Sequence, residues 1–294
     1  MKSGSTYVSK TLCRYFNIEN PEMAYDWQAE HNMTGTLRAM VRGRPFCLNF
    51  HMLPHVGNIV AFNQDRIGFV GLWRNLGDMI VSYDDHQFRE PGPSQPFFLL
   101  DPAKYMAMEP EARVRFMIDT VTPWYLSFYL RWRAANGTLR PYERMVEDQR
   151  TFFAEMMIED FVHPPIMDRL DQVLAVPAGP GERFNAGRVG RSAERLSDAN
   201  KKRLEERILE HPDVAQLEIL LWELPWDVPA LAPVSPYDGK VVRTASDDTP
   251  FFVSRGHAYP VRTTWLAGRV GERRSPRVIP DAELAGLPRG EQLL

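Results

Sequence analysis

The chain has 294 residues, of which 44% are hydrophobic and 25% charged, and this length and composition allow a substantial buried core. The formal net charge of −3 argues against a general nucleic-acid surface and against an anionic-membrane surface. No uninterrupted apolar run approaches the roughly 18 residues of a membrane-spanning helix. Because the two cysteines, Cys13 and Cys47, have no metal-ligand spacing and form no disulfide framework, we expect a reduced, cytoplasmic protein.

A turn followed by a helix is predicted at the start of the chain. Residues 2–6, K-S-G-S-T, lead into apolar residues that recur at helical spacing. Backbone N–H groups at a helix N-terminus, with a lysine and hydroxyls beside them, form an anion site. Lys2 precedes the glycine, whereas the nucleoside-triphosphate P-loop ends in G-K-[ST], so the stretch does not fit an ordinary ATPase. The alternative, in which residues 3–6 only cap a helix, stays open from this stretch alone.

The following segments alternate between strands and helices. Residues 44–51 and 66–73 are short apolar runs with β-branched or aromatic side chains, which predicts two buried strands of a parallel sheet. Residues 137–145 resemble another strand end. Helices are predicted over 75–88, with Asp78 in the first turn, over 110–135, with a bend at Pro123, and over 147–157. This alternation predicts an α/β fold with three layers, in which helices flank a parallel sheet.

The last third of the chain changes in composition. Residues 176–197 mix glycines and prolines with charges, which predicts a loop, and Ser197-Asp198 is expected to cap a helix over 199–211. A proline-rich linker over 225–236 then leads to a stretch that alternates and turns like a small β meander. We therefore expect a first domain over 1–236 and a small β-rich module over 237–294.

Two polar residues stand where α/β sheets bind ligands. The strand predicted over 66–73 ends at Trp73, so Arg74 emerges at the carboxyl edge of the sheet. Ser82 lies eight residues further on, in the helix that follows. Because an arginine offers a forked donor to a phosphate and a hydroxyl can add a further hydrogen bond, the pair indicates a phosphate site.

Taken together, these segments resemble the sulfotransferases that use 3′-phosphoadenosine 5′-phosphosulfate (PAPS). K-S-G-S-T-Y (2–7), R-N-L-x-D-x-x-V-S-Y (74–83), Y-E-R-M-V-E-D (142–148) and G-R-V-G (187–190) occur in the order and approximate spacing of that family. The resemblance covers roughly residues 1–210 and implies a P-loop-like domain. Each motif is unconvincing alone, but the second and third are fairly specific together.

The resemblance implies a role for each matching residue. The loop that holds the 5′-phosphosulfate corresponds to Lys2, Ser3, Gly4, Ser5 and Thr6. Tyr7 and Tyr142 match positions near the adenine, and Arg74 and Ser82 match the pair that grips the 3′-phosphate. F-H-M-L-P (50–54) resembles the T-H-L-P segment of the family, which makes His51 the counterpart of the catalytic base, with His55 as its rival.

One segment departs from the family pattern. Where many members have R-K-G, this chain has Asn185-Ala186-Gly187, so two cations of the 3′-phosphate clamp are missing. Asn185 and Gly187 remain candidate donor-binding residues, and Arg183 or Arg188 is a candidate replacement for the cations.

Sulfuryl transfer resembles phosphoryl transfer, in which the protein mainly positions the reactants and stabilises charge. Lys2 would neutralise charge on the departing nucleotide, and His51 would take the proton from the hydroxyl or amine of a small-molecule, lipid or saccharide acceptor. No metal is needed. The alternatives are a catalytically silent nucleotide-binding or interaction protein and, third, a kinase, against which the absent G-K-[ST] speaks. The sequence indicates no oligomeric state.

Both ends of the chain raise a further expectation. The module over 237–294 resembles the small repeat modules of bacterial surface and carbohydrate-related proteins, and a glycan-binding module would favour a saccharide acceptor. Its alternative is a β extension without a site. Since a phosphate loop normally follows a strand, the parallel sheet apparently lacks its first strand, and we expect Met1 to be a late start, with an apolar strand of about five residues upstream.

Overall fold

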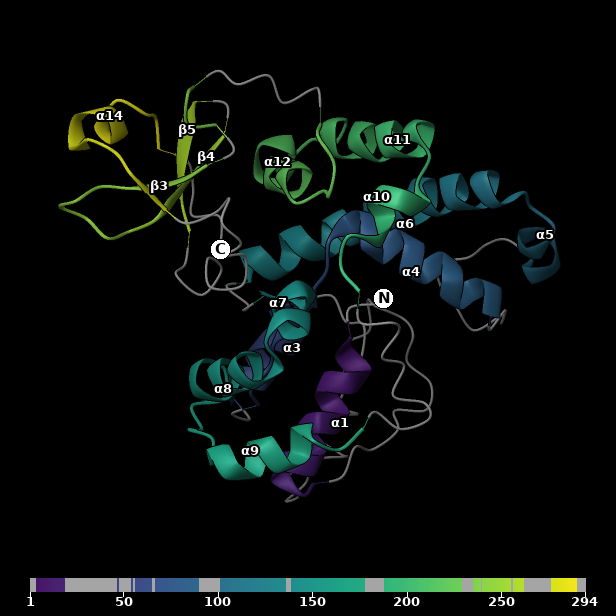
Figure 1. Ribbon diagram of the computed structural model, residues 1–294, viewed down its shortest axis with the longest axis horizontal. Coiled ribbons are helices and arrows are strands. Elements are labelled where there is room, and N and C mark those ends of the chain that lie inside the picture. The colour runs from purple at the N-terminus through teal and green to yellow at the C-terminus, as the bar shows by residue number, and fades with distance from the viewer. Residues whose placement is uncertain are drawn as a thin grey trace.

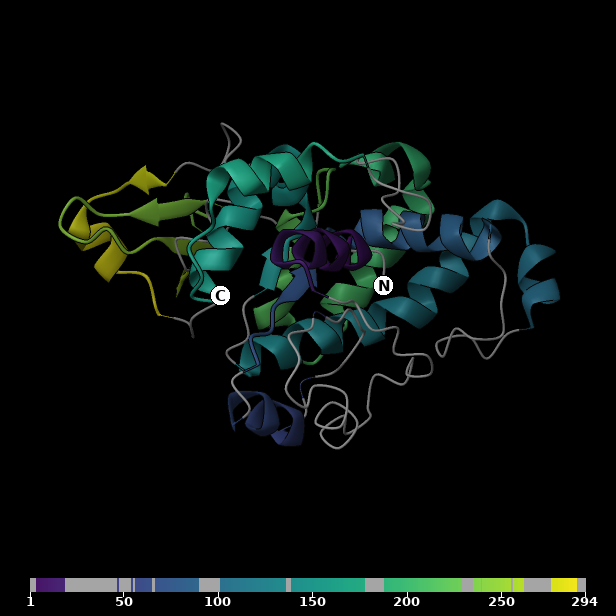
Figure 2. The ribbon, with the colours of Figure 1, turned by 90° about the horizontal axis from the view of Figure 1, so that it is seen from below.

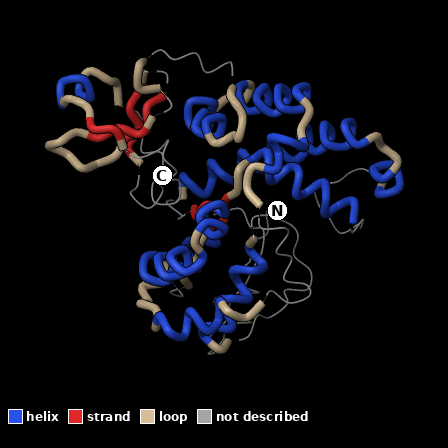
Figure 3. The backbone as a smooth tube through the Cα atoms, viewed as in Figure 1, coloured by secondary structure: helices blue, strands red, loops and turns tan. Residues whose placement is uncertain are grey.

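The computed structural model describes residues 4–18, 47, 54, 56–64, 67–89, 101–135, 139–177, 188–228, 235–238, 240–254, 256–261 and 276–289. These residues form a mixed α/β structure with small sheets (Figures 1 and 3). The elements up to α9 are α1 Ser5–Phe16, α3 Val56–Gln64, β1 Gly71–Trp73, α4 Leu76–Arg89, α5 Pro102–Met106, α6 Pro110–Ala134, β2 Leu139–Pro141, α7 Tyr142–Glu147, α8 Gln149–Glu159 and α9 Met167–Leu174. The remaining elements are α10 Arg191–Arg195, α11 Asp198–Leu209, α12 Val214–Trp222, β3 Val241–Arg243, β4 Phe251–Ser254, β5 His257–Pro260, β6 Arg277–Val278 and α14 Asp281–Ala285.

Strands β1 and β2 form a two-stranded parallel sheet near the centre of the molecule (Figure 3). Gly71 pairs with Leu139 and Trp73 with Pro141, so the two strands end level with each other. The strand predicted over 66–73 is shorter than expected, since residues 67–70 carry no strand pairing and β1 pairs with only three residues of β2. Of the strand predicted over 44–51, the structure describes only Cys47, which lies outside any strand. The predicted strand end near 137–145 is confirmed as β2.

A first hydrophobic core lies between α4, α6, α11 and α12, in the upper half of Figure 1. Trp73 stacks on Tyr125 of α6, with ring centroids 4.4 Å apart, and contacts Tyr129 at 4.5 Å. The helices predicted over 75–88 and 110–135 are confirmed as α4 and α6. Helix α6 contains Pro123, and the bend expected there stays a prediction. The predicted cap is also confirmed, because the Ser197 hydroxyl accepts a hydrogen bond from the Asn200 N–H at the start of α11.

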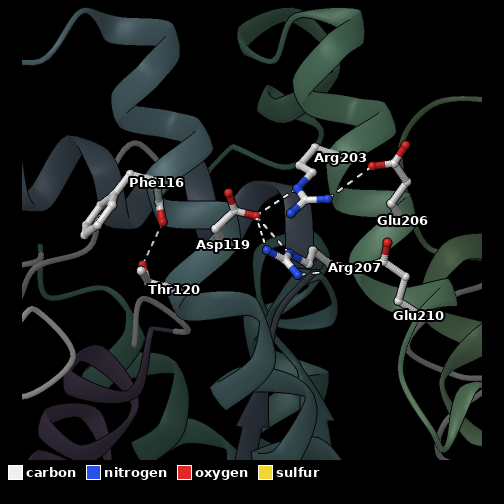
Figure 4. Close-up of polar contacts among 7 residues, drawn as sticks. All are labelled: Phe116, Asp119, Thr120, Arg203, Glu206, Arg207 and Glu210. Carbon is white, nitrogen blue, oxygen red and sulfur yellow. Dashed lines mark hydrogen bonds and ion pairs between the residues drawn. The ribbon is translucent and has the colours of Figure 1, made fainter.

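Helices α6 and α11 are also joined by charges at their surface (Figure 4). Arg203 and Arg207 lie one turn apart on α11, and both donate hydrogen bonds to the same oxygen of Asp119 on α6. Each arginine also pairs with a glutamate three residues further along α11. This network links α11 to α6 beside their shared hydrophobic core.

A second hydrophobic core lies between α1, α7, α8 and α9, in the lower part of Figure 1. The helix predicted over 147–157 is wrong at its start, because α7 ends at Glu147 and α8 begins at Gln149. Asp148 takes an extended backbone conformation between them, and its carboxylate accepts the Thr151 N–H at 3.0 Å as the cap of α8. The loop predicted over 176–197 needs a similar correction, since residues 191–195 form the short helix α10.

The C-terminal residues form a four-stranded sheet with the order β5-β4-β3-β6, in which β3, β4 and β5 are antiparallel neighbours and β6 runs parallel to β3. One face packs on α14 through a small core that includes Phe251. The other face contributes Phe252 to the first core, where its ring lies 6.4 Å from that of Trp222 of α12. Figure 2 shows this sheet at one end of the molecule and α5 at the other, with α1 between them.

Two features are absent from the described residues. None of the helices described has the length and apolarity that a membrane crossing requires. Within the same part of the chain, no three His, Cys, Asp or Glu side chains gather as they would around a metal ion.

Candidate functional site

The carboxyl ends of β1 and β2 bring Arg74 and Tyr142 into contact. Each is the residue that directly follows its strand, and both are buried. The carbon of the Arg74 guanidinium lies 4.4 Å from the centre of the Tyr142 ring, which is a cation–π geometry. Because the strands are parallel and end level, two residues from separate predicted motifs meet at one edge of the sheet.

The N-terminus of α1 reaches the same place. Gly4 is the N-cap of α1 with φ 77°, and it offers no capping side chain to the first turn of the helix. A Cβ atom on Gly4 would lie 2.8 Å from the Met145 side chain and 2.9 Å from the Tyr142 ring. Only glycine fits this approach without displacing a neighbour, so the helix start rests directly on Tyr142. Ser5 and Thr6 form the first residues of this helix, whereas Lys2 and Ser3 lie outside the described residues.

Tyr7, which the resemblance places near the adenine, is buried in the second core. Its hydroxyl donates a hydrogen bond to Oε1 of Gln149, 2.7 Å away at the start of α8, and its ring makes an edge contact with Phe153. Tyr7 therefore ties α1 to α8 and holds the helix start in place. A contact between Tyr7 and an adenine stays a prediction.

Arg74 is held by both its backbone and its side chain. Its N–H donates to the Tyr125 hydroxyl at 3.0 Å, and that hydroxyl donates to the Arg74 carbonyl at 3.1 Å. Burial raises the pKa of Tyr125, so its hydroxyl keeps the proton that this contact uses. The guanidinium Nη2 donates to the Arg188 carbonyl at 3.2 Å. The backbone of Arg188, the second residue of the G-R-V-G segment, thus lies at the guanidinium, while Arg188 itself is exposed.

The charges around Tyr142 act in opposite directions. Burial raises the pKa of the Tyr142 hydroxyl, and the negative charges of Glu143 and Asp78 add to that effect. The positive charges of Arg74 and Arg191 oppose it without cancelling it. The hydroxyl consequently stays neutral at physiological pH, and the ring presents an uncharged face next to a fixed arginine.

Glu143 and Asp78 connect the elements around this edge of the sheet through hydrogen bonds that the motifs did not predict. Glu143, the second residue of α7, accepts a hydrogen bond from the Asn75 N–H at 2.8 Å, which joins α7 to the start of α4. Asp78 accepts hydrogen bonds from Gly190 and Ser192, although the sequence suggested only a favourable charge in the first turn of α4. Both residues lie inside the predicted motifs, but only their spatial neighbours reveal their contacts.

Of the remaining predicted site residues, the structure describes Ser82 and leaves four others outside the described residues. Ser82 is buried in α4. His51, its rival His55, Asn185 and Gly187 lie outside the described residues. Cys47, four residues before His51, packs against the second core. A hydrogen bond with Cys13 of α1, together with burial, raises the pKa of the Cys47 thiol. That contact brings one residue of the 44–51 segment to α1.

No protein-family model matches this chain, and no curated protein matches its sequence. Among solved structures, it is similar to the crystal structure of mouse sulfotransferase SULT7A1 complexed with PAP. That likeness covers 74% of this chain and 85% of the mouse chain, with 15% sequence identity and a TM-score of 0.44.

Proposed function

We propose that this chain is a sulfotransferase that moves the sulfuryl group of PAPS to a hydroxyl or amine of a small-molecule, lipid or saccharide acceptor. The observation that supports it best is the meeting of Gly4, Arg74 and Tyr142 at one sheet edge. These residues come from three separate motifs, and the resemblance assigns all three motifs to the same ligand. A chance resemblance gives no reason for the three segments to converge.

The residues at this edge fit a nucleotide with a second phosphate. The start of α1 carries the positive end of a helix dipole and has no capping side chain at Gly4, which suits the 5′-phosphosulfate. Arg74 presents a buried, forked cation to the 3′-phosphate, and the neutral ring of Tyr142 suits the adenine. PAPS, when bound, supplies the sulfuryl group. Lys2 would neutralise charge on the departing nucleotide, and His51 would hold the proton of the acceptor.

The first prediction tests the recognition of the 3′-phosphate. We expect calorimetry to show that the purified protein binds 3′-phosphoadenosine 5′-phosphate (PAP) more tightly than adenosine 5′-phosphate. Arg74→Ala should weaken PAP binding by about 1.5–3 kcal/mol, because a charge-assisted contact is lost, and should leave adenosine 5′-phosphate binding almost unchanged. Arg113→Ala is the matched control, since Arg113 is also buried but binds Asp84 on the far part of α4. Equal losses for both nucleotides in Arg74→Ala would contradict the assignment.

The second prediction concerns the base. His51→Ala should lower the turnover of sulfate transfer by roughly 10²–10⁴ with little change in PAP affinity, because a general base acts on the acceptor rather than on the donor. His55→Ala is the control and should keep near-normal turnover. Turnover that survives in His51→Ala but collapses in His55→Ala would transfer the role to His55.

A catalytically silent nucleotide-binding protein is the second candidate. The sequence Asn185-Ala186-Gly187 favours it, because two cations of the family clamp are absent. Tight PAP binding without sulfate transfer from PAPS to phenol, sterol and saccharide acceptors would support this candidate over the enzyme.

A further inference from the structure

We infer that Asp78 is a positioning residue for Arg74, which it serves by holding the Arg188–Ser192 turn against the start of α4. The inference rests on the proposed function, because the group that Arg74 is expected to bind is the 3′-phosphate of the donor. The Asp78 side chain accepts hydrogen bonds from the turn at Gly190 and Ser192. It would act through the turn, in which the Arg188 carbonyl accepts a hydrogen bond from the Arg74 guanidinium.

The Asp78 carboxylate accepts three hydrogen bonds from this turn. Oδ2 accepts the Gly190 N–H at 2.6 Å, and Oδ1 accepts both the N–H and the hydroxyl of Ser192 at 2.8 Å each. The residue is only 1% exposed. A buried carboxylate is costly unless it is hydrogen-bonded, so these bonds fix the turn and the carboxylate together.

Residues 74–78 hydrogen-bond to both ends of the Arg188–Ser192 turn. Arg74 lies just before α4 and binds the Arg188 carbonyl, and Asp78 lies in the first turn of α4 and binds Gly190 and Ser192. Helix and turn also approach closely, because a Cβ atom on Gly77 would lie 2.7 Å from the Ser192 hydroxyl oxygen. Movement of the turn would therefore carry the Arg188 carbonyl away from the guanidinium.

The same geometry indicates how the turn serves the ligand. Gly190 is the N-cap of α10, where N–H groups would ordinarily attract an anion, but the N–H groups of Gly190 and Ser192 already bind the Asp78 carboxylate. The turn would thus act on a phosphate through the orientation of Arg74 and not through these two N–H groups.

The test compares nucleotides in matched variants of the full chain. Asp78→Asn replaces one acceptor oxygen by an amide NH₂ group that faces N–H donors, and we expect it to weaken PAP binding about 10–50-fold and adenosine 5′-phosphate binding less than about 3-fold. Ser192→Ala removes a single hydroxyl bond and should weaken PAP about 2–5-fold. In the double variant Asp78→Asn/Arg74→Ala, the loss should equal that of Arg74→Ala alone, because both changes disable one group.

Asp84→Asn is the control for loss of stability. Asp84 lies on the same helix, is equally buried, and accepts hydrogen bonds from Tyr105 and Arg113 instead of the turn. Its PAP-to-adenosine 5′-phosphate ratio should match that of the unmodified protein. An unchanged ratio in Asp78→Asn overturns the inference, and if that variant does not fold, an unchanged ratio in Ser192→Ala does so. A parent protein that does not distinguish the two nucleotides refutes the proposed function and this inference with it.

Discussion

Two glycines with nearly the same backbone conformation have different surroundings. Gly4 and Gly190 are the N-caps of α1 and α10, with φ 77° and 81°. A Cβ on Gly4 would overlap Met145 and Tyr142, whereas nothing in the described part of the chain lies within 4 Å of a Cβ on Gly190. Positive φ is strained for any L side chain, so substitution of Gly4 adds a collision to a strain that both positions share.

This difference gives the third prediction. Gly190→Ala should lower the free energy of unfolding by about 1–2 kcal/mol through strain, and Gly4→Ala by about 2–5 kcal/mol because it also displaces the Tyr142 ring. Urea denaturation measures both values. Calorimetry should show that Gly4→Ala weakens PAP and adenosine 5′-phosphate alike, since the two ligands share the 5′-phosphate and the adenine. Equal losses of stability in the two variants would contradict the close approach of Gly4 to Tyr142.

At the scale of elements, ion pairs add to the hydrophobic packing of α11 on α6. Partial burial by itself raises the pKa of Asp119, but the hydrogen bonds and charges of Arg207 and Arg203 outweigh it and hold the pKa below its usual range. A carboxylate with a lowered pKa stabilises the fold above its ordinary pKa of about 3.9, and this stabilisation is lost as the pH falls through the lowered value. The carboxylate is about one-third exposed, with a side-chain exposure of 30%, so its contribution is modest.

The fourth prediction follows from this sign. Asp119→Asn should lower the free energy of unfolding by about 1 kcal/mol at neutral pH, and the difference from the parent protein should shrink as the pH falls below about 4. Urea denaturation at a series of pH values measures it. Asp171→Asn is the control, because the pair of Asp171 with Arg150 is more exposed and should contribute less. A difference that grows as the pH falls would show that Asp119 is not a charged partner of the arginines.

At the scale of the whole molecule, the C-terminal sheet is divided between two cores. Phe251 and Phe252 are neighbours on β4, yet Phe251 belongs to the small core under α14 and Phe252 to the core of the body. Successive side chains of a strand point to opposite faces, so one strand serves both cores. The Ser254 hydroxyl also donates to the carboxylate of Glu218 on α12. The expected boundary near residue 236 therefore separates segments whose side chains share a core, and whether these segments fold independently stays a prediction.

The fifth prediction tests this coupling. Scanning calorimetry of the parent protein should show one cooperative transition, because unfolding of the sheet would expose part of the body core. Phe252→Ala should remove about 3–5 kcal/mol of docking and produce a separate transition for the sheet. Phe251→Ala should destabilise the sheet itself with a similar cost, while the sheet stays docked. Two transitions already present in the parent protein would show that the module over 237–294 is independent.

Local sequence patterns were sufficient for several elements and their caps. The apolar spacing over 75–88 and the Ser197-Asp198 cap specified α4 and α11, because helices and their caps depend on neighbours within one or two turns. The strand predicted over 66–73 also placed Arg74 at a strand end, and the strand end predicted over 137–145 contains Tyr142. Both residues are found at strand ends. A residue that directly follows a buried parallel strand lies at the carboxyl edge of the sheet.

Tertiary structure determined features that the spacing of apolar residues along the chain does not predict. The break between α7 and α8 depends on the extended conformation of Asp148, and an amphipathic pattern continues across it. Asp78 looked like an ordinary acid at a helix start, but its three donors come from residues more than a hundred positions away. Likewise, the need for glycine at position 4 arises from the Tyr142 ring. The sequence by itself determined which residue types were available at the sheet edge. Only the packing of distant segments determined which of them touch, because such contacts depend on chain geometry over long separations and not on neighbours along the chain.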